Sequence, residues 1–175
     1  MIRTLSSKIV YENKWMTVRE DEIEREDGSR GIYGVIDKPD FAVVIPMEND
    51  GFHLVEQYRY PTGQRSWEFP SGAFPAGVTG TREELAAAEL AEETGFTAAT
   101  LTHLGYLHSA KSMTGEGFDV FLATGLTPGE ARREVTEQDM VQRWFPRGEV
   151  ERMIRTGVIT DDSTLAAYLL LTMRD

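Results

Sequence analysis

The chain has 175 residues, 41% of them hydrophobic, and a formal net charge of −11 at pH 7. That length suffices for one compact domain with a sizeable core and requires no second full domain. The absence of cysteine excludes disulfides, a thiol nucleophile and cysteine-ligated zinc, and the acidic balance argues against nucleic acid as the main partner. Residues 1–4 contain no apolar signal core, and no run approaches the ~18–20 apolar residues that span a bilayer. We therefore expect a cytoplasmic protein that does not associate with membranes.

The first part of the chain is rich in predicted strands. Apolar or alternating runs predict strands over residues 9–11, 16–23, 31–36, 41–47 and 52–58. Asp27-Gly28 supplies a hairpin turn between the second and third of these, and residues 48–51 form the turn between the last two. The first three strands predict a small N-terminal antiparallel sheet, and the other two begin a second sheet.

Residues 81–95 are predicted to form one capped helix. Thr81 and Glu84 have the spacing of a capping box, in which the threonine hydroxyl accepts a backbone N–H and the glutamate reaches back. Gly95 is placed to take the left-handed conformation that ends a helix. At about 100° per residue, small and apolar side chains gather on one side and can pack against a sheet: Ala86, Ala87, Leu90 and Ala91.

Three glutamates occupy the other side of this helix. Glu89, Glu92 and Glu93 stand at positions i, i+3 and i+4, so their Cβ atoms lie roughly 5–6 Å apart. Such carboxylates repel one another unless a divalent cation or solvent screens them. Mg²⁺ takes oxygen ligands and binds through a few carboxylates together with substrate phosphates, so it suits this group. The alternative is a solvated acidic helix face, and the helix alone leaves both open.

The rest of the chain adds strands and then helices. Strands are predicted near residues 98–107, 119–123 and 140–145, and two closing helices over residues 146–156 and 162–173. Because helices do not alternate strictly with strands, this order predicts an α+β protein with a mixed sheet enclosed by helices.

The run of residues 72–96 resembles the Nudix box, whose pattern is G-x5-E-x7-R-E-U-x-E-E-x-G-U with U a bulky aliphatic residue. The second half matches closely, with these residues on E, U, E, E, G and the final position: Glu89, Leu90, Glu92, Glu93, Gly95 and Phe96. The first half departs from the pattern. Ala88 stands at the arginine position, Gly80 stands at the early glutamate position, and the stretch that opens at Gly72 is two residues longer.

In the Nudix family such a box holds Mg²⁺, with Mn²⁺ as an alternative ion. The resemblance implies that Glu89 and Glu93 bind the metal most directly, helped by the backbone carbonyl of Ser71, and that Glu92 adds a ligand or supports one. The family's arginine, which orients neighbouring carboxylates, is missing here together with the early glutamate. A structural ion pair is therefore absent as a unit.

The remainder of the chain resembles the ADP-ribose pyrophosphatase branch of the family. The matching phrases are residues 57–61, 67–70, 121–123 and 144–146, together with Glu116 and Glu137. The resemblance implies an α/β/α Nudix sandwich with a mixed sheet over residues 39–175, preceded by an antiparallel sheet over residues 1–38. In that branch the N-terminal sheet builds a homodimer and helps to close each active site, so a homodimer is expected.

Two loop acids are implied as catalytic residues beside Glu92. Glu137 matches the glutamate that serves as general base, on a loop able to close over bound substrate. Glu116, flanked by glycines, matches an acid at the metal and phosphate site. An ordinary solvated loop glutamate is the alternative for Glu137.

Four residues are candidates for substrate binding. Arg59 matches a basic position that contacts phosphate, although a strand-end arginine is often only a surface charge. Trp15 or Tyr33 in the N-terminal sheet can stack on a purine from the partner subunit, or else belong to the core. Glu68 either reaches the substrate or caps its strand.

The sequence therefore predicts a Mg²⁺-dependent hydrolase that cleaves the diphosphate of a nucleoside diphosphate sugar, ADP-ribose first, to a nucleoside monophosphate and a sugar phosphate. A GDP-sugar or another nucleoside diphosphate is the alternative substrate. A Nudix-fold module that binds a nucleotide sugar without hydrolysing it is the alternative from another class. Ala88 and Gly80 favour that module, whereas the retained Glu89, Glu92 and Glu93 favour catalysis.

Overall fold

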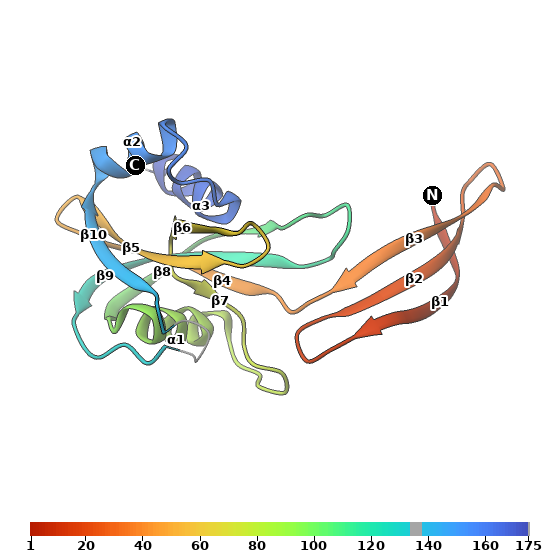
Figure 1. The fold of residues 1–175 in the computed structure, drawn as a ribbon, viewed down its shortest axis with the longest axis horizontal. Coiled ribbons are helices and arrows are strands. Elements are labelled where there is room, and N and C mark those ends of the chain that lie inside the picture. Colours follow the sequence, from red (N-terminus) through yellow and green to blue (C-terminus); the bar gives the residue numbers. More distant parts are fainter. Residues whose placement is uncertain (134–137, 175) are drawn as a thin grey trace.

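Two β-sheets and three helices make up the fold of this computed structural model, which describes residues 1–133 and 138–174 (Figure 1). A three-stranded antiparallel sheet projects to one side of a larger mixed sheet, which has helices on both faces. The expected α+β class, a mixed sheet between helices preceded by a small antiparallel sheet, is therefore confirmed. None of the helices in the described residues is both long and apolar enough to cross a lipid bilayer.

The N-terminal sheet consists of β1 (Arg3–Glu12), β2 (Thr17–Glu24) and β3 (Arg30–Asp37), in that order. β2 and β3 join at the expected turn, where Arg25 N–H donates to the Ser29 carbonyl over 2.8 Å and Gly28 has a φ of +81°. β1 is longer than predicted because backbone pairing with β2 extends it through polar residues that have no apolar pattern. Most of its side chains are exposed, whereas Asp21 and Ile23 on β2 are buried.

The main sheet has seven strands among the described residues, in the order β10-β5-β4-β9-β8, with β6 paired to β5 and β7 paired to β4. The bounds are β4 (Phe41–Glu48), β5 (Gly51–Arg59), β6 (Gln64–Glu68), β7 (Ser71–Gly72), β8 (Thr97–His108), β9 (Gly117–Thr127) and β10 (Val141–Pro146). β4 and β9 run parallel, whereas the other pairs are antiparallel. The β4–β5 hairpin closes as predicted, through Asn49 and Asp50 with φ of 51° and 52°, the sign that a type I′ turn requires.

The two faces of the main sheet carry separate apolar cores. One core packs α2 (Arg147–Arg155) and α3 (Asp162–Thr172) against the sheet, and the other packs α1 (Arg82–Thr94) against the opposite face. Along β9, Val120 belongs to the first core and Phe121 to the second, as the two-residue period of a strand requires. These three layers form the α/β/α sandwich.

Helix α1 begins and ends as predicted. The Thr81 hydroxyl accepts from Glu84 N–H over 3.1 Å, the Glu84 carboxylate accepts from Thr81 N–H over 2.7 Å, and Gly95 has a φ of +78°. The buried stripe differs from the predicted one, because Glu93 is buried and Ala87 is exposed. The prediction that Ala87 packs against the sheet is therefore wrong, and the helix turns one of its glutamates toward the protein interior.

Strands β6 and β7 have no counterpart in the sequence prediction. Charged and polar residues dominate β6, and Pro70 separates it from the two-residue β7, so neither shows an apolar alternation. Pairing with β5 and β4 makes them strands. Between them, Phe69 N–H donates to the hydroxyl of Thr164 in α3 over 2.9 Å, which fixes the segment that leads into α1.

The loop between β8 and β9 ties the two sheets together. Ile36 N–H donates to the Met113 carbonyl over 2.8 Å, and the Tyr33 hydroxyl donates to the Ser112 carbonyl over 2.9 Å. A bridge between Ile36 and Thr114 extends this contact. The N-terminal sheet is thus joined to the main sheet by hydrogen bonds as well as by the chain.

Candidate active site

Helix α1 lies against β7, and this contact places its glutamates. A Cβ atom added to Gly72 would lie 2.6 Å from Cδ of Glu89, so glycine alone lets the carboxylate come this close to the backbone. One residue earlier, Ser71 N–H donates to the Glu93 carboxylate over 3.3 Å. Strand β7 therefore meets two of the three glutamates, and it brings Ser71, whose carbonyl is the predicted metal ligand, next to Glu93.

Two of the three carboxylates form an open face. Glu89 and Glu92 line a cavity of about 140 Å³, whereas Glu93 is only 1% exposed and lies toward Ser71. Within residues 1–133 and 138–174, no group of three or more acidic or histidine side chains is arranged so that it could hold a metal ion. An open face of this kind suits Mg²⁺, which keeps several waters and binds through one or two carboxylates plus substrate phosphates.

Ala88 and Gly80 stand where a Nudix box has an arginine and a glutamate. Ala88 lines the cavity beside Glu89 and brings no charge to it. Gly80 is crowded, because a Cβ atom there would lie 2.7 Å from Cζ of Phe74 and 2.9 Å from Oε2 of Glu84, so both side chains would have to shift. The ring of Phe74, which packs on the core under α1, occupies the space that a longer residue would need.

Arg59 and Glu68 form an ion pair at the ends of β5 and β6. Arg59 Nε donates to both carboxylate oxygens of Glu68, over 3.1 and 3.0 Å, and Nη2 donates to one of them. Burial alone would lower the pKa of Arg59, but hydrogen bonds and attraction from Glu68, with the charges of Asp161 and Glu93 behind it, raise the pKa overall. Arg59 is therefore a permanent cation within the field of Glu93, and Glu68 holds it there.

The structure describes one of the two predicted loop acids, Glu116, and not the other, Glu137. Glu116 is largely buried just before β9, and its Oε1 lies 2.9 Å from Nζ of Lys38, which follows β3. This ion pair joins the predicted site acid to the N-terminal sheet. Glu137 falls in the segment 134–137, outside the described residues.

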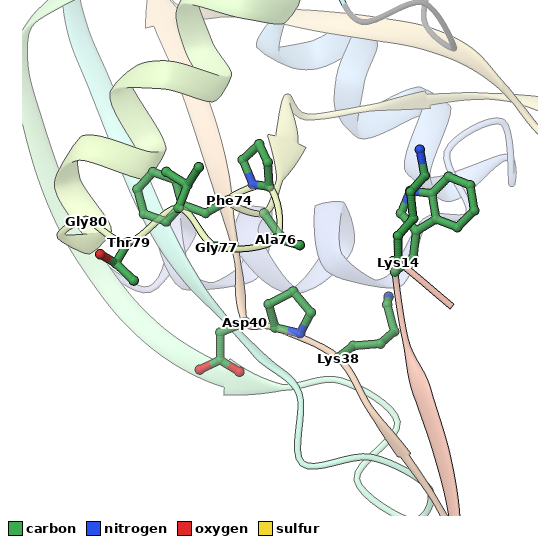
Figure 2. A pocket seen from close by; sticks show the side chains of 13 residues that line it. Lys14, Lys38, Asp40, Phe74, Ala76, Gly77, Thr79 and Gly80 are labelled. Carbon is green, nitrogen blue, oxygen red and sulfur yellow. The ribbon is translucent and has the colours of Figure 1, made fainter. Parts of the chain in front are cut away.

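A groove of about 760 Å³ opens between the N-terminal sheet and the loop that precedes α1 (Figure 2). Lys14 and Trp15, in the turn between β1 and β2, line it together with residues 38–40 and 73–80. Trp15 is 64% exposed, and Nζ of Lys14 lies 4.2 Å from the centre of its ring. Residues 73–75 also wall the cavity at Glu89 and Glu92, so the groove adjoins the carboxylate face.

Comparison with known protein families agrees with this geometry. Residues 38–168 match the family model described as NUDIX domain, a span that contains α1, β7 and the Arg59–Glu68 pair. The chain belongs to the Nudix family. Residues 2–36 match a second model, described as nucleoside diphosphate sugar hydrolase N-terminal domain.

The matches to similar proteins cover most or almost all of this Nudix chain. It is 31% identical to an ADP-ribose pyrophosphatase of Mycobacterium tuberculosis over 169 residues, which cover 95% of this chain and 81% of the relative. It is 27% identical to an ADP-ribose pyrophosphatase of Bacillus subtilis over 141 residues, or 80% and 75% of the two chains. The crystal structure of an ADP compounds hydrolase has the same fold, with a TM-score of 0.85 and 23% identity over 98% of this chain and 92% of the other. The expected Nudix sandwich with its N-terminal sheet is confirmed.

The residues at α1 fit the divalent metal that the family uses. Every donor there is an oxygen, from the three glutamates or from the carbonyl of Ser71, and oxygen ligands suit Mg²⁺ and Mn²⁺. The bare backbone of Gly72 provides the close approach that Glu89 needs. The chemistry of the donors therefore fits a divalent ion of this kind.

Sequence reasoning missed three residues beside the site: Lys14, Lys38 and Phe74. Lys14 has a local signal, because a cation next to an exposed aromatic residue in a turn is a simple cation–π arrangement. Lys38 has none, because its partner Glu116 comes from a distant part of the chain. Phe74 lies in the loop whose two extra residues are visible in the sequence, yet the length alone does not show where the ring packs.

We predict that Gly72→Ala weakens metal binding about 10–100-fold, the range typical for disturbing the support of metal ligands. The new methyl group displaces the Glu89 carboxylate, to which it would be too close. Mn²⁺ titration followed by electron paramagnetic resonance measures the change. Gly115→Ala is the matched control, because a Cβ atom there meets nothing within 4 Å. Equal affinity in the two variants would contradict the placement of Glu89.

Proposed function

We propose that this Nudix pyrophosphohydrolase cleaves the diphosphate of a nucleoside diphosphate sugar to a nucleoside monophosphate and a sugar phosphate, with ADP-ribose as the first substrate to test. The observation that carries the proposal is the contact between β7 and two glutamates of α1. Glu89 lies close to Gly72, and Glu93 accepts a hydrogen bond from Ser71 N–H. The names of the two relatives, both ADP-ribose pyrophosphatases, and of the N-terminal family model support the substrate class.

The carboxylate face holds Mg²⁺, with Mn²⁺ as the alternative. Glu89, Glu93 and the carbonyl of Ser71 are its protein ligands, and Glu92 adds a ligand or supports one. When bound, the metal neutralises charge on the diphosphate and activates the attacking water. Because Glu89 and Glu92 line an open cavity, substrate phosphates would have room beside them.

Arg59 binds a phosphate oxygen of the substrate. A guanidinium has five N–H donors, more than one carboxylate uses, so Arg59 can contact phosphate while Glu68 still holds it. The raised pKa of Arg59 ensures that it stays charged. Glu68 is thus a residue that orients Arg59 and does not itself need to reach the substrate.

The groove beside the carboxylate face receives the nucleoside. Its volume of about 760 Å³ is ample for a base with its ribose, and Trp15 offers an exposed aromatic surface for stacking. Figure 2 shows Lys14 and Lys38 on one side of this groove and Phe74 on another, so a ligand meets both cations and apolar surface. Tyr33, the other aromatic candidate, is engaged with the Ser112 carbonyl.

Proton removal is assigned to a loop acid. Glu137 is the general base by resemblance to the ADP-ribose pyrophosphatase branch, and Glu116 supports the metal and phosphate site. The contact of Glu116 with Lys38 keeps that acid close to the entrance of the groove, which Lys38 also lines.

Residues 1–38 act as a dimerisation unit and residues 39–175 as the hydrolase domain. The sheet of β1, β2 and β3 is small, and several of its apolar side chains are exposed: Ile2, Ile9, Val10, Tyr11 and Ile32. A sheet of three short strands needs a partner surface to bury such residues. A second copy of the chain supplies it.

We predict that Glu93→Gln lowers turnover by about 10²-fold or more, because metal assistance contributes several kcal/mol to the transition state. The substitution removes the charge at nearly constant volume, so the fold should persist by circular dichroism. Glu83→Gln, on the exposed first turn of α1, is the control. The measurement is a screen of ADP-ribose, GDP-sugars and other nucleoside diphosphates with Mg²⁺ and Mn²⁺, with products identified by mass.

The parent protein decides between hydrolase and binding module in the same screen. Tight binding of a nucleotide sugar without product, under either metal, would reject the hydrolase and support a sensor in which Ala88 and Gly80 replace the box ion pair. Turnover of a GDP-sugar in preference to ADP-ribose would support the assignment as a hydrolase and replace ADP-ribose as its proposed substrate. Full activity of Glu93→Gln would remove the metal assignment.

We predict that Glu137→Gln keeps metal and substrate affinity but slows cleavage about 10²–10⁴-fold, the usual contribution of general acid–base catalysis. The parent should lose activity at acidic pH as its base becomes protonated, and this limb should vanish in the variant. Single-turnover kinetics measures the step directly. A cleavage rate within about threefold of the parent, far below that range, would reject Glu137 and direct attention to Glu116.

We predict that Ile32→Glu converts a dimer into monomers. Ile32 is 65% exposed on the edge strand β3, and a carboxylate there would have to be buried in the interface. Light scattering at micromolar concentration measures the mass, which is 19.7 kDa for one chain. Val158→Glu, at an exposed residue after α2, is the control. A parent protein that runs as a monomer would contradict the proposed assembly.

A further inference from the structure

A buried carboxylate joins the start of α1 to two strands. Nη1 of Arg82, the first residue of the helix, lies 2.9 Å from Oδ1 of Asp119 on β9. Nε2 of His103 on β8 lies 2.6 Å from the same oxygen. Asp119 is 9% exposed, so these two hydrogen bonds replace much of the hydration that its carboxylate loses on burial. None of the three residues belongs to the site described above.

Asp119 lies on the same row of the sheet as Gly72. Ala42 on β4 pairs with Asp119 on one side and with Gly72 on the other. Two strand spacings therefore separate Asp119 from Gly72, or roughly 9–10 Å. Asp119 also shares its face of β9 with Phe121, which packs in the core under α1.

Arg82 and Glu89 are about as far apart along the helix as Asp119 and Gly72 are across the sheet. Seven residues separate them, which is nearly two turns, so the two side chains project from the same side about 10 Å apart along the axis. Arg82 meets Asp119 while Glu89 meets the backbone of Gly72. Helix α1 thus approaches one row of the sheet at two points, through an ion pair at its first residue and through the close approach of Glu89 to Gly72.

We propose that Arg82, bound to Asp119 and supported by His103, is the positioning residue that keeps the glutamates of α1 in place over β7. It takes over the task of the ion pair that a Nudix box makes at these two positions, where this chain has Ala88 and Gly80 and hence no charged side chain. The inference rests on the proposed function, because the position of α1 affects chemistry only if its glutamates bind the metal. Arg82 acts through the helix and touches neither metal nor substrate.

The test is the Mn²⁺ affinity of the full-length protein without substrate, measured by electron paramagnetic resonance. Arg82→Met keeps the aliphatic stem but removes the ion pair, and it should weaken Mn²⁺ binding about 10-fold or more, as loss of support for metal ligands does. Arg82→Lys should recover most of the affinity, because its ammonium reaches the same carboxylate. Arg152→Met is the matched control, since it removes an exposed ion pair with Glu149 in α2, 2.6 Å long.

The outcomes separate positioning from stability and from the metal assignment itself. Unchanged affinity in Arg82→Met, or an equal loss in Arg152→Met, overturns the positioning role. A parent protein that binds no Mn²⁺ overturns the metal site of the proposed function and this inference with it. If circular dichroism shows that Arg82→Met does not fold, Asp119→Asn replaces it, because that variant keeps the side-chain shape, and the same weakening is expected.

Discussion

The close approach of α1 to β7 is the constraint on which the rest of the site depends. The Glu89 carboxylate reaches the sheet because residue 72 has no side chain, and Glu93 enters the interior where Ser71 offers an N–H. Taking a carboxylate out of water is costly unless hydrogen bonds or a cation compensate for the lost hydration. The fold therefore creates a place where a divalent ion is favoured, and the helix cap and the core under α1 serve to hold that place.

The site also resolves a conflict between the charge of the chain and that of a diphosphate. A protein with a net charge of −11 repels an anionic substrate at long range. Around the carboxylate face, however, Arg59 lies on one side, and Lys14 and Lys38 line the neighbouring groove. In the proposed function, these cations and a bound metal offset the acidic charge around the diphosphate. Glu68 and Glu116 hold two of the cations in position, so part of the acidic excess serves to orient them.

Local chemistry made much of the fold predictable, and long-range pairing set the limit. Thr81, Glu84 and Gly95 defined α1 because a cap depends on neighbours in sequence, and the glutamates could be placed on the helix for the same reason. Strands β6 and β7, the Arg59–Glu68 pair and the Lys38–Glu116 pair could not be read in the same way. Each depends on the register of a distant strand or loop, which no short pattern encodes. The burial of Glu93 follows equally from tertiary packing, which buries it together with Leu85, Ala86 and Leu90 of the same helix.

The hydrogen bonds between the N-terminal sheet and the β8–β9 loop bear on the order in which parts of the protein fold during synthesis. The Tyr33 hydroxyl finds its acceptor at Ser112, which is 79 residues further along the chain. A ribosome therefore completes β1, β2 and β3 well before their docking loop exists, and such distant contacts form late because closing long loops is slow. The nascent sheet also presents apolar side chains such as Ile9 and Ile32, which remain exposed in the finished chain. The polar residues interspersed along β1 and β2 keep this early fragment dispersed while the sandwich is being synthesised.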